Sequence, residues 1–328
     1  LTFPCDTDTP DEPRDGGMTF TPDFGYLTAY APATASPTGG AVSANVAGDQ
    51  SANMASEEVL NGIYLLTSYA LLADDTPWAK TRLPFARELM VSLENRDHWE
   101  PEKRTGILKA QSQRAGGGTE VSGLAFLGET FAHVPGNLYL AVKTFCANMM
   151  LTTYYQANNE LHSADYSYAF AQKTAGSIVA RFDAAAGILP ANLLTPDTSA
   201  GGVRLIAALE PLAVPTYLGL TSTLPEYFPE LHAVLKTHAL SCLKNSPEGC
   251  IDPATGALRL VSNSPVVSPA KVANILYVLE KLFQIDVQTE HPSLWRELAN
   301  WSQVAAASTT LADRVDGEKR VAVSRFNS

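Results

Sequence analysis

The feature that most constrains the fold is a helical spacing of apolar residues that recurs along the chain. It is clearest from Val272 to Phe283, where apolar residues return every three or four positions. Another such stretch follows Ser56-Glu57-Glu58, whose hydroxyl and acids suit the exposed amides of a helix N-terminus. The same spacing predicts further helices at about 77–95, 138–149, 170–182, 204–220, 228–243 and 292–306.

The segments between these helices predict how they are connected. Short turns, such as 183–190 and 252–258, alternate with longer irregular stretches, and the alternation of period two that strands require is rare. We therefore expect a mainly α fold of stacked helical hairpins whose long loops gather at one end. Residues 1–50 are rich in Gly, Pro, Ser, Thr and Ala and predict an irregular lead-in, which leaves 51–328 as the helical domain.

Composition excludes several function classes. The chain has 328 residues with 23 Lys and Arg against 34 Asp and Glu, a formal net charge of −11. Such an acidic chain, without a basic run, does not suit a phosphate backbone, so no nucleic acid partner is expected. No apolar stretch approaches the roughly 18 to 20 residues that cross a bilayer, so no membrane span is expected. Histidines at metal-ligand spacing and nucleotide fingerprints are missing, so we expect neither a metal nor a cofactor.

The cysteines give an indication of the cellular compartment in which the protein works. Four are too few for a disulfide scaffold, but Cys242 and Cys250 bracket a short turn that a disulfide could close. We expect this disulfide and, with it, an extracellular or periplasmic location; two reduced thiols on a loop are the alternative. The chain starts at Leu1 with a polar, Pro-rich stretch, so we also expect that something upstream has been removed or omitted.

Several motifs, in the same order along the chain, resemble the family 52 glycoside hydrolases, the retaining β-xylosidases. Residues 95–107 carry that family's Arg-Asp-His, followed by Pro-Glu-Lys-Arg and Gly. The other motifs are Gly17-Met-Thr-Phe-Thr-Pro-Asp23-Phe-Gly25, Arg114 with Gly116-Gly-Gly-Thr-Glu120, Asn137-Leu-Tyr-Leu-Ala141-Val-Lys143, Ile206-Ala-Ala-Leu-Glu210-Pro-Leu-Ala-Val-Pro215 and Ser262-Asn-Ser264. The resemblance implies an (α/α)6 toroid, which agrees with the predicted hairpins, and a saccharide ligand.

The resemblance also implies where catalytic carboxylates belong. A retaining glycosidase uses two carboxylates about 5 to 5.5 Å apart, one as nucleophile and one as general acid. In the family the nucleophilic Glu lies upstream of the position of Leu1, together with an N-terminal β-sandwich, so we expect a β-sandwich segment or partner chain to supply it. The family's acid stretch carries two aspartates, which are replaced here by Ala125 and Gly128. Hydrolysis by this chain alone is therefore not expected.

Glu120 is the acid that we expect to transfer a proton if the chain retains chemistry. Burial beside Leu124 and Phe126 would raise the pKa of its carboxyl toward that of a general acid. Arg114 with Glu120 is either a structural pair or the polar wall of a saccharide site. This acid lies in a Gly-rich stretch, 105–135, that lacks helical spacing, and structureless stretches beyond about 15 residues are usually functional or disordered.

Four more residues complete the expected saccharide site. Asp97 and His98 belong either to a solvated loop tied by local hydrogen bonds or to the rim of the site. The resemblance adds Asp23 and Asn137 as substrate-binding residues. Two functions follow from this set: the toroidal portion of a carbohydrate-active enzyme, which the retained Arg-Asp-His motif favours, or a non-catalytic binding or structural subunit of an extracellular assembly, which the replacement at Ala125 favours.

Overall fold

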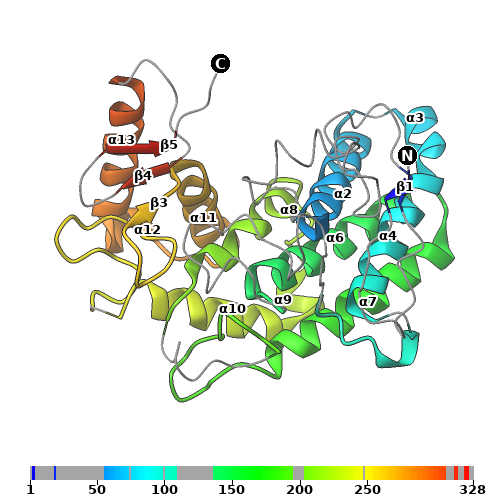
Figure 1. Cartoon of the computed structure of the whole chain (residues 1–328), viewed down its shortest axis with the longest axis horizontal. Coiled ribbons are helices and arrows are strands. Elements are labelled where there is room, and N and C mark those ends of the chain that lie inside the picture. The colour runs from blue at the N-terminus through cyan, green and yellow to red at the C-terminus, as the bar shows by residue number, and fades with distance from the viewer. Residues whose placement is uncertain are drawn as a thin grey trace, which may run out of the picture. The chain divides into compact units, whose positions relative to one another are not determined.

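The chain divides into two compact units, Leu1–Ser177 and Ile178–Ser328. The structure, a computed structural model, describes residues 2–3, 18–19, 55–73, 75–98, 100–108, 136–194, 203–246, 248–307, 314–316 and 321–324. The described residues are mainly α-helical, which confirms the predicted class (Figure 1). The predicted division into a lead-in, 1–50, and one helical domain, 51–328, stays a prediction.

The first unit is built around long helices. Its described helices are α2 (Ala55–Leu72), α3 (Thr76–Thr81), α4 (Leu83–Asp97), α6 (Leu138–Ala157), α7 (Leu161–Val179), whose last turn enters the second unit, and the short 3-10 helix η4 (Pro101–Lys103). Two short strands, β1 (Thr2–Phe3) and β2 (Met18–Thr19), pair antiparallel. Among the described helices, none combines the length with the apolar character that a bilayer crossing needs.

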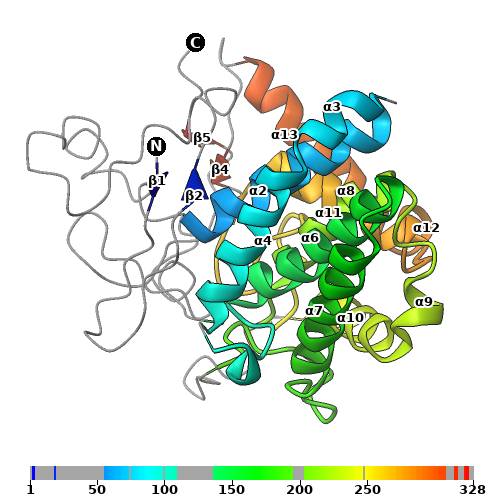
Figure 2. The same cartoon turned by 90° about the vertical axis from the view of Figure 1, so that its right-hand side faces the viewer.

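The centre of the first unit is α6, which packs against α2 and α4 (Figure 2). Its apolar residues, such as Val142 and Phe145, are almost completely buried. Its polar Thr144 and Asn148 are buried too, and each donates to the carbonyl one turn earlier, Leu140 O at 2.8 Å and Thr144 O at 2.9 Å. A helix can bury polar side chains on one face because its own backbone carbonyls satisfy them.

The second unit combines helices with a small sheet. Its described helices are η7 (Ile206–Leu212, a 3-10 helix), α8 (Ala213–Tyr217), α9 (Leu224–Tyr227), α10 (Pro229–Cys242), α11 (Pro269–Lys281), α12 (Val287–Glu290) and α13 (Pro292–Ala307). The strands β3 (Val266–Val267), β4 (Arg314–Asp316) and β5 (Val321–Ser324) form an antiparallel sheet in that order. The buried η7 packs against α10 and α11, and α13 packs against α11 and β5.

Each predicted helix overlaps a helix of the structure, but α6 continues to Ala157, α7 begins at Leu161, and two predictions differ in kind. The helix expected at 77–95 is two helices, because Pro84 lies in the first turn of α4 and favours a new helix start after Arg82. The helix expected at 204–220 begins as 3-10 helix, since Pro211 offers no backbone N–H to an α-helical hydrogen bond. The predicted turn at 183–190 is confirmed: Asp183 Oδ1 accepts from the amides of Ala185, at 2.9 Å, and Ala186, at 3.0 Å.

Candidate functional site

The predicted site residues divide between described and undescribed parts of the chain. Three of them lie outside the described residues, namely Asp23, Arg114 and Glu120. Asp97, His98 and Asn137 are described, and all three lie in the first unit.

Asp97, at the end of α4, anchors the loop that follows. Its side chain is 3% exposed. Its Oδ2 accepts from the amides of Thr105, at 2.6 Å, and Gly106, while Oδ1 accepts from Thr105 Oγ1 at 3.1 Å. The carboxylate therefore holds Thr105 and Gly106 against the end of α4. The predicted contact of Asp97 with a saccharide stays a prediction.

His98 is half-buried at the start of this loop. Its Nδ1 accepts from the Glu100 amide at 3.0 Å, which fixes the orientation of the ring. Arg104 Nε donates to the His98 carbonyl at 2.7 Å and so fixes the backbone on both sides of the ring. The predicted contact of His98 with a saccharide stays a prediction.

Glu94, Arg104 and Tyr166, which we call the α4 cluster, tie the same loop to α4 and α7. Arg104 donates to Glu94 Oε2 at 2.6 Å and to Tyr166 OH at 3.0 Å, and Tyr166 OH donates to Glu94 Oε2 at 3.2 Å. Burial raises the pKa of Glu94, and this effect outweighs the Arg104 guanidinium, which lowers it. Among the described residues, Glu94 Oε1 is buried without a hydrogen-bond partner.

Asn137 caps the N-terminus of α6. Its Oδ1 accepts from the amides of Tyr139, at 2.8 Å, and Leu140, at 3.3 Å, which are the exposed donors of the first turn. The side chain is buried. Its role in the described structure is therefore that of a helix cap, and its predicted saccharide contact stays a prediction.

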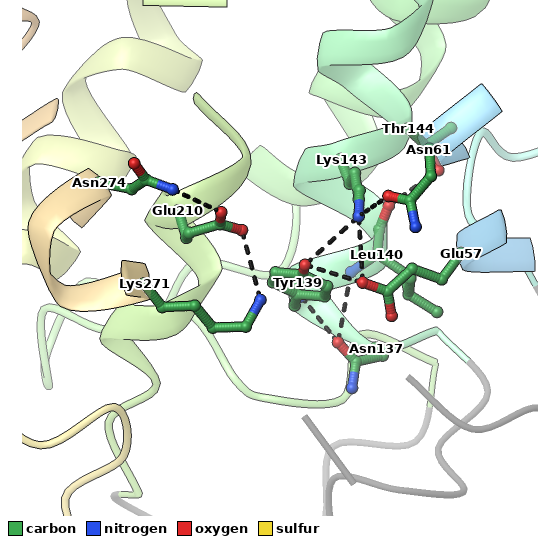
Figure 3. Close-up of polar contacts among 10 residues, drawn as sticks. All are labelled: Glu57, Asn61, Asn137, Tyr139, Leu140, Lys143, Thr144, Glu210, Lys271 and Asn274. Carbon is green, nitrogen blue, oxygen red and sulfur yellow. Dashed lines mark hydrogen bonds and ion pairs between the residues drawn. The ribbon is translucent and has the colours of Figure 1, made fainter. Parts of the chain in front are cut away.

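The first turns of α2 and α6 meet in a buried polar network of Glu57, Asn61, Tyr139 and Lys143 (Figure 3). Lys143 Nζ donates to Asn61 Oδ1 at 2.7 Å and Glu57 Oε1 at 3.0 Å, and Tyr139 OH donates to the same Glu57 oxygen at 2.9 Å. The side chains of Lys143 and Glu57 are 8% and 5% exposed. Buried charges are costly unless they are paired and hydrogen-bonded, as they are here. Sequence reasoning missed this network, because Glu57 and Lys143 are far apart along the chain.

The ends of the undescribed stretches join the first unit beside this network. Gly136 N donates to Leu108 O at 3.0 Å and closes the base of the 109–135 stretch directly before α6. Arg96 Nη1 donates to Ser56 Oγ at 3.3 Å and so joins the end of α4 to the start of α2. The described residues Leu108, Gly136 and Ser56 therefore lie at one end of the unit, where α2 and α6 begin and α4 ends.

The second unit carries a separate polar group of Glu210, Lys271 and Asn274, which we call the Glu210 triad. Asn274 Nδ2 donates to Glu210 Oε1 at 3.0 Å, and Lys271 Nζ lies 3.6 Å from Glu210 Oε2 (Figure 3). Sequence reasoning matched the motif around Glu210 but gave the residue no role. The signal was present, since Glu210 is the one acid within the apolar run of η7.

The structure corrects the expectation of a disulfide between Cys242 and Cys250. Both are free cysteines, and both are completely buried. The turn is closed instead by the backbone, with Cys250 N donating to Cys242 O at 2.7 Å, while the Cys250 thiol donates to Arg204 O at 3.3 Å. Burial, together with the neighbouring Cys250 thiol, raises the pKa of Cys242. The alternative of two reduced thiols therefore describes this structure.

Within the described ranges, no group of His, Cys, Asp and Glu side chains could hold a metal ion.

Comparison with known proteins shows a distant, partial similarity to β-xylosidases. A β-xylosidase of Geobacillus stearothermophilus is 27% identical over 174 residues, which is 53% of this chain and 24% of that protein. A second β-xylosidase of the same organism is 28% identical over 116 residues, 34% of this chain and 18% of that protein. The matched stretches thus span a quarter or less of each relative. No protein-family model matches the chain.

Proposed function

We propose that this chain is the saccharide-binding, toroidal portion of a carbohydrate-active protein related to the family 52 β-xylosidases. The observation that carries the proposal is the 27% identity to a β-xylosidase over 174 residues. The helices are proposed to form an (α/α)6 toroid, and the ligand is a xylose-containing saccharide. The mainly helical fold of the described residues supports this arrangement.

The end of the first unit where α2 and α6 begin supports a binding site there. The base of the 109–135 stretch lies beside Asn137, so Arg114 and Glu120 belong to a segment that starts and ends at this place. His98 lies at the start of the loop that Asp97 anchors. Saccharide hydroxyls both donate and accept hydrogen bonds, so a site with an imidazole, a guanidinium and a carboxylate suits them.

Binding without turnover follows from the residues at the family's acid positions. Ala125 and Gly128 replace its aspartates, and general-acid assistance contributes about 10²- to 10⁴-fold to such reactions. The nucleophile is proposed to come from an N-terminal β-sandwich segment or a partner chain. The chain assayed by itself therefore binds the saccharide and leaves its glycosidic bond intact.

Calorimetric titration with D-xylose and xylobiose, together with a nitrophenyl β-xyloside assay, tests this function. We expect heat of binding with xylobiose and no release of nitrophenol. Absence of binding to both sugars overturns the proposal. Release that is lost in Glu120→Gln and kept in Glu129→Gln would instead show that the chain is a hydrolase by itself and that Glu120 is a catalytic group.

A second function is a non-catalytic subunit of an extracellular assembly. The observation that favours it is again the replacement of both aspartates by Ala125 and Gly128, since a binding subunit needs neither. Native mass spectrometry of the protein purified from its source separates the two functions. A partner chain or longer polypeptide that brings a β-xylosidase nucleophile favours the enzyme, and a partner without glycosidase activity favours the subunit.

A further inference from the structure

Arg104 directly follows η4, on the loop that begins at His98, and two helices hold its guanidinium. Only 8% of its side chain is exposed. Its Nη1 donates to Glu94 Oε2 on α4 at 2.6 Å and to Tyr166 OH on α7 at 3.0 Å, while Tyr166 OH donates to the same Glu94 oxygen at 3.2 Å. The α4 cluster therefore fixes the place of this guanidinium relative to both helices.

The same guanidinium binds the peptide of His98 through a different atom. Arg104 Nε donates to the His98 carbonyl oxygen at 2.7 Å. Because a guanidinium is a rigid plane, fixing Nη1 also fixes the direction in which Nε donates. The Glu100 amide donates to His98 Nδ1 at 3.0 Å. Arg104 thus holds the backbone of His98, and the Glu100 amide holds its ring.

The far end of the loop is closed by other bonds. The Asp97 carboxylate accepts from the amides of Thr105 and Gly106, and Thr174 Oγ1 on α7 donates to the Gly106 carbonyl at 3.0 Å. None of these bonds uses the side chain of Arg104. We therefore expect that losing the bond from Arg104 Nε loosens the start of the loop, where His98 lies, and leaves its end in place.

We propose that Arg104 is a positioning residue for saccharide binding, which acts by holding His98, and that Glu94 and Tyr166 hold Arg104 in turn. The inference rests on the proposed function, in which the imidazole of His98 belongs to the saccharide site. These three residues need no contact with the sugar. A side chain that is ordered before binding saves the free energy of ordering it at that moment, so a loosened His98 binds the same ligand more weakly.

A purely structural ion pair is the competing explanation. Glu94 and Arg104 are buried, so a change in either can lower the stability of the chain whether or not a ligand binds. A structural role changes the melting temperature and leaves the affinity of the folded protein for the saccharide as it is. A positioning role lowers that affinity, and it changes the surroundings of His98 before any ligand is added.

The test compares Arg104→Lys and Tyr166→Phe with wild type. Lys keeps a cation beside Glu94 but lacks the planar fork that also reaches the His98 carbonyl, and Phe keeps the ring of Tyr166 without its hydroxyl. We expect both variants to bind xylobiose about three- to tenfold more weakly in calorimetric titration. We also expect the nuclear magnetic resonance signals of the His98 ring to shift in both variants without ligand.

Two matched controls make the same chemical changes at exposed side chains of the first unit. Arg87→Lys alters a side chain that is 46% exposed, and Tyr69→Phe alters a residue that is 47% exposed. Both controls are expected to bind xylobiose with wild-type affinity and to leave the His98 signals unshifted. Binding weakened equally in the controls would show that the loss does not depend on Arg104.

The outcomes separate this inference from the proposed function. Wild type that binds neither D-xylose nor xylobiose overturns both. Wild type that binds xylobiose, with an affinity unchanged in Arg104→Lys and Tyr166→Phe, overturns the positioning role alone. Weaker binding with unshifted His98 signals overturns it as well, because the loss then does not pass through His98. If both variants unfold, the Arg104 Nε–H signal of wild type decides: a shift on titration with xylobiose supports the role, and an unshifted signal rejects it.

Discussion

At the residue scale, His238 makes the stability of the second unit depend on pH. The ring is completely buried; its Nδ1 accepts from Leu189 N at 3.0 Å, and Nε2 donates to Leu205 O at 3.1 Å. These bonds hold the neutral imidazole, and burial lowers the pKa of His238 to about 4. Protonation would place a second hydrogen on Nδ1 against the Leu189 amide, so the folded state resists it.

We predict that the free energy of unfolding falls as the pH drops from 6.5 toward 4. In this range the unfolded chain binds a proton at His238 that the folded chain does not bind, so the contribution is complete above the unfolded pKa of about 6.5 and is lost as the pH falls. The loss reaches about 3 kcal/mol near pH 4. Urea unfolding at several pH values would measure it, with His238→Gln as comparison. An equal pH dependence in both proteins would contradict the prediction.

Gly106 is a second residue whose identity the fold requires. Its φ is +82°, and a Cβ at this position would lie 2.5 Å from Thr174 N. We predict that Gly106→Ala lowers the free energy of unfolding by about 2 to 4 kcal/mol, because it adds both backbone strain and a clash. Gly176→Ala is the matched control: nothing lies within 4 Å of its Cβ, and Ala favours its helix by up to about 1 kcal/mol. Denaturation curves that show equal stability for both variants would refute the argument.

At the scale of elements, the α4 cluster holds the 98–106 loop to its helix. The side chains of Arg104 and Glu94 are only 8% and 5% exposed. Arg104→Met leaves the Glu94 carboxylate buried without its cation, and we predict a loss of about 3 kcal/mol in the free energy of unfolding. The double variant Glu94→Gln with Arg104→Met recovers part of this loss, since no buried charge remains.

The control for this prediction is the exposed ion pair of Arg87 and Glu160. Its side chains are 46% and 33% exposed, so Arg87→Met is expected to cost less than about 1 kcal/mol. Thermal unfolding of the two variants compares the stability lost in Arg104→Met with that lost in Arg87→Met. A smaller loss for Arg104→Met than for Arg87→Met would show that burial does not determine the strength of these pairs.

The sequence predicted elements better than it predicted contacts. Apolar periodicity predicted the bounds of α10 and α13 closely, because a helix that buries one face needs apolar residues at helical spacing. It predicted a helix over 204–220 but not that its first part, η7, is a 3-10 helix, because apolar spacing does not show that Pro211 offers no backbone N–H. The Asp-His pair at 97–98 was recognisable in the sequence. The hydrogen bond from the Gly106 amide to the Asp97 carboxylate was not, because it depends on a backbone turn that has no local sequence pattern.

At the scale of the whole molecule, the two units are expected to respond separately to substitutions. Each has its own buried core, around α6 in the first unit and around η7 in the second. We predict that Gly106→Ala reduces amide hydrogen-exchange protection in α2, α4 and α6 more than in α10 and α11. Mass spectrometry of peptides after exchange measures this. Equal loss of protection in all five helices would show that the chain unfolds as one cooperative body.

The candidate site could be predicted only in part from the sequence, for a physical reason. The family motifs predicted Asn137 as a site residue. The structure shows that its side chain caps the N-terminus of α6, which the motif does not reveal. Glu57 and Lys143 are far apart in the sequence and meet only because α2 packs against α6. Such a contact leaves no local pattern in the sequence. The disulfide expectation failed at Cys242 and Cys250 because their spacing shows only that a disulfide could close the turn, and both thiols are free in the structure.

The hydrogen bond from Gly136 to Leu108 has a consequence for how such a protein diversifies. It brings the two ends of the 109–135 stretch together on the helical body, whatever lies between them. Once the ends are held, doubling the length of the connecting stretch costs only about 0.6 kcal/mol in closure entropy. The ends of α2, α4 and α6 that meet here are tied to one another by bonds between described residues, such as Arg96 with Ser56 and Tyr139 with Glu57. The connection between Leu108 and Gly136 can therefore change in length during evolution at a small entropic cost to folding.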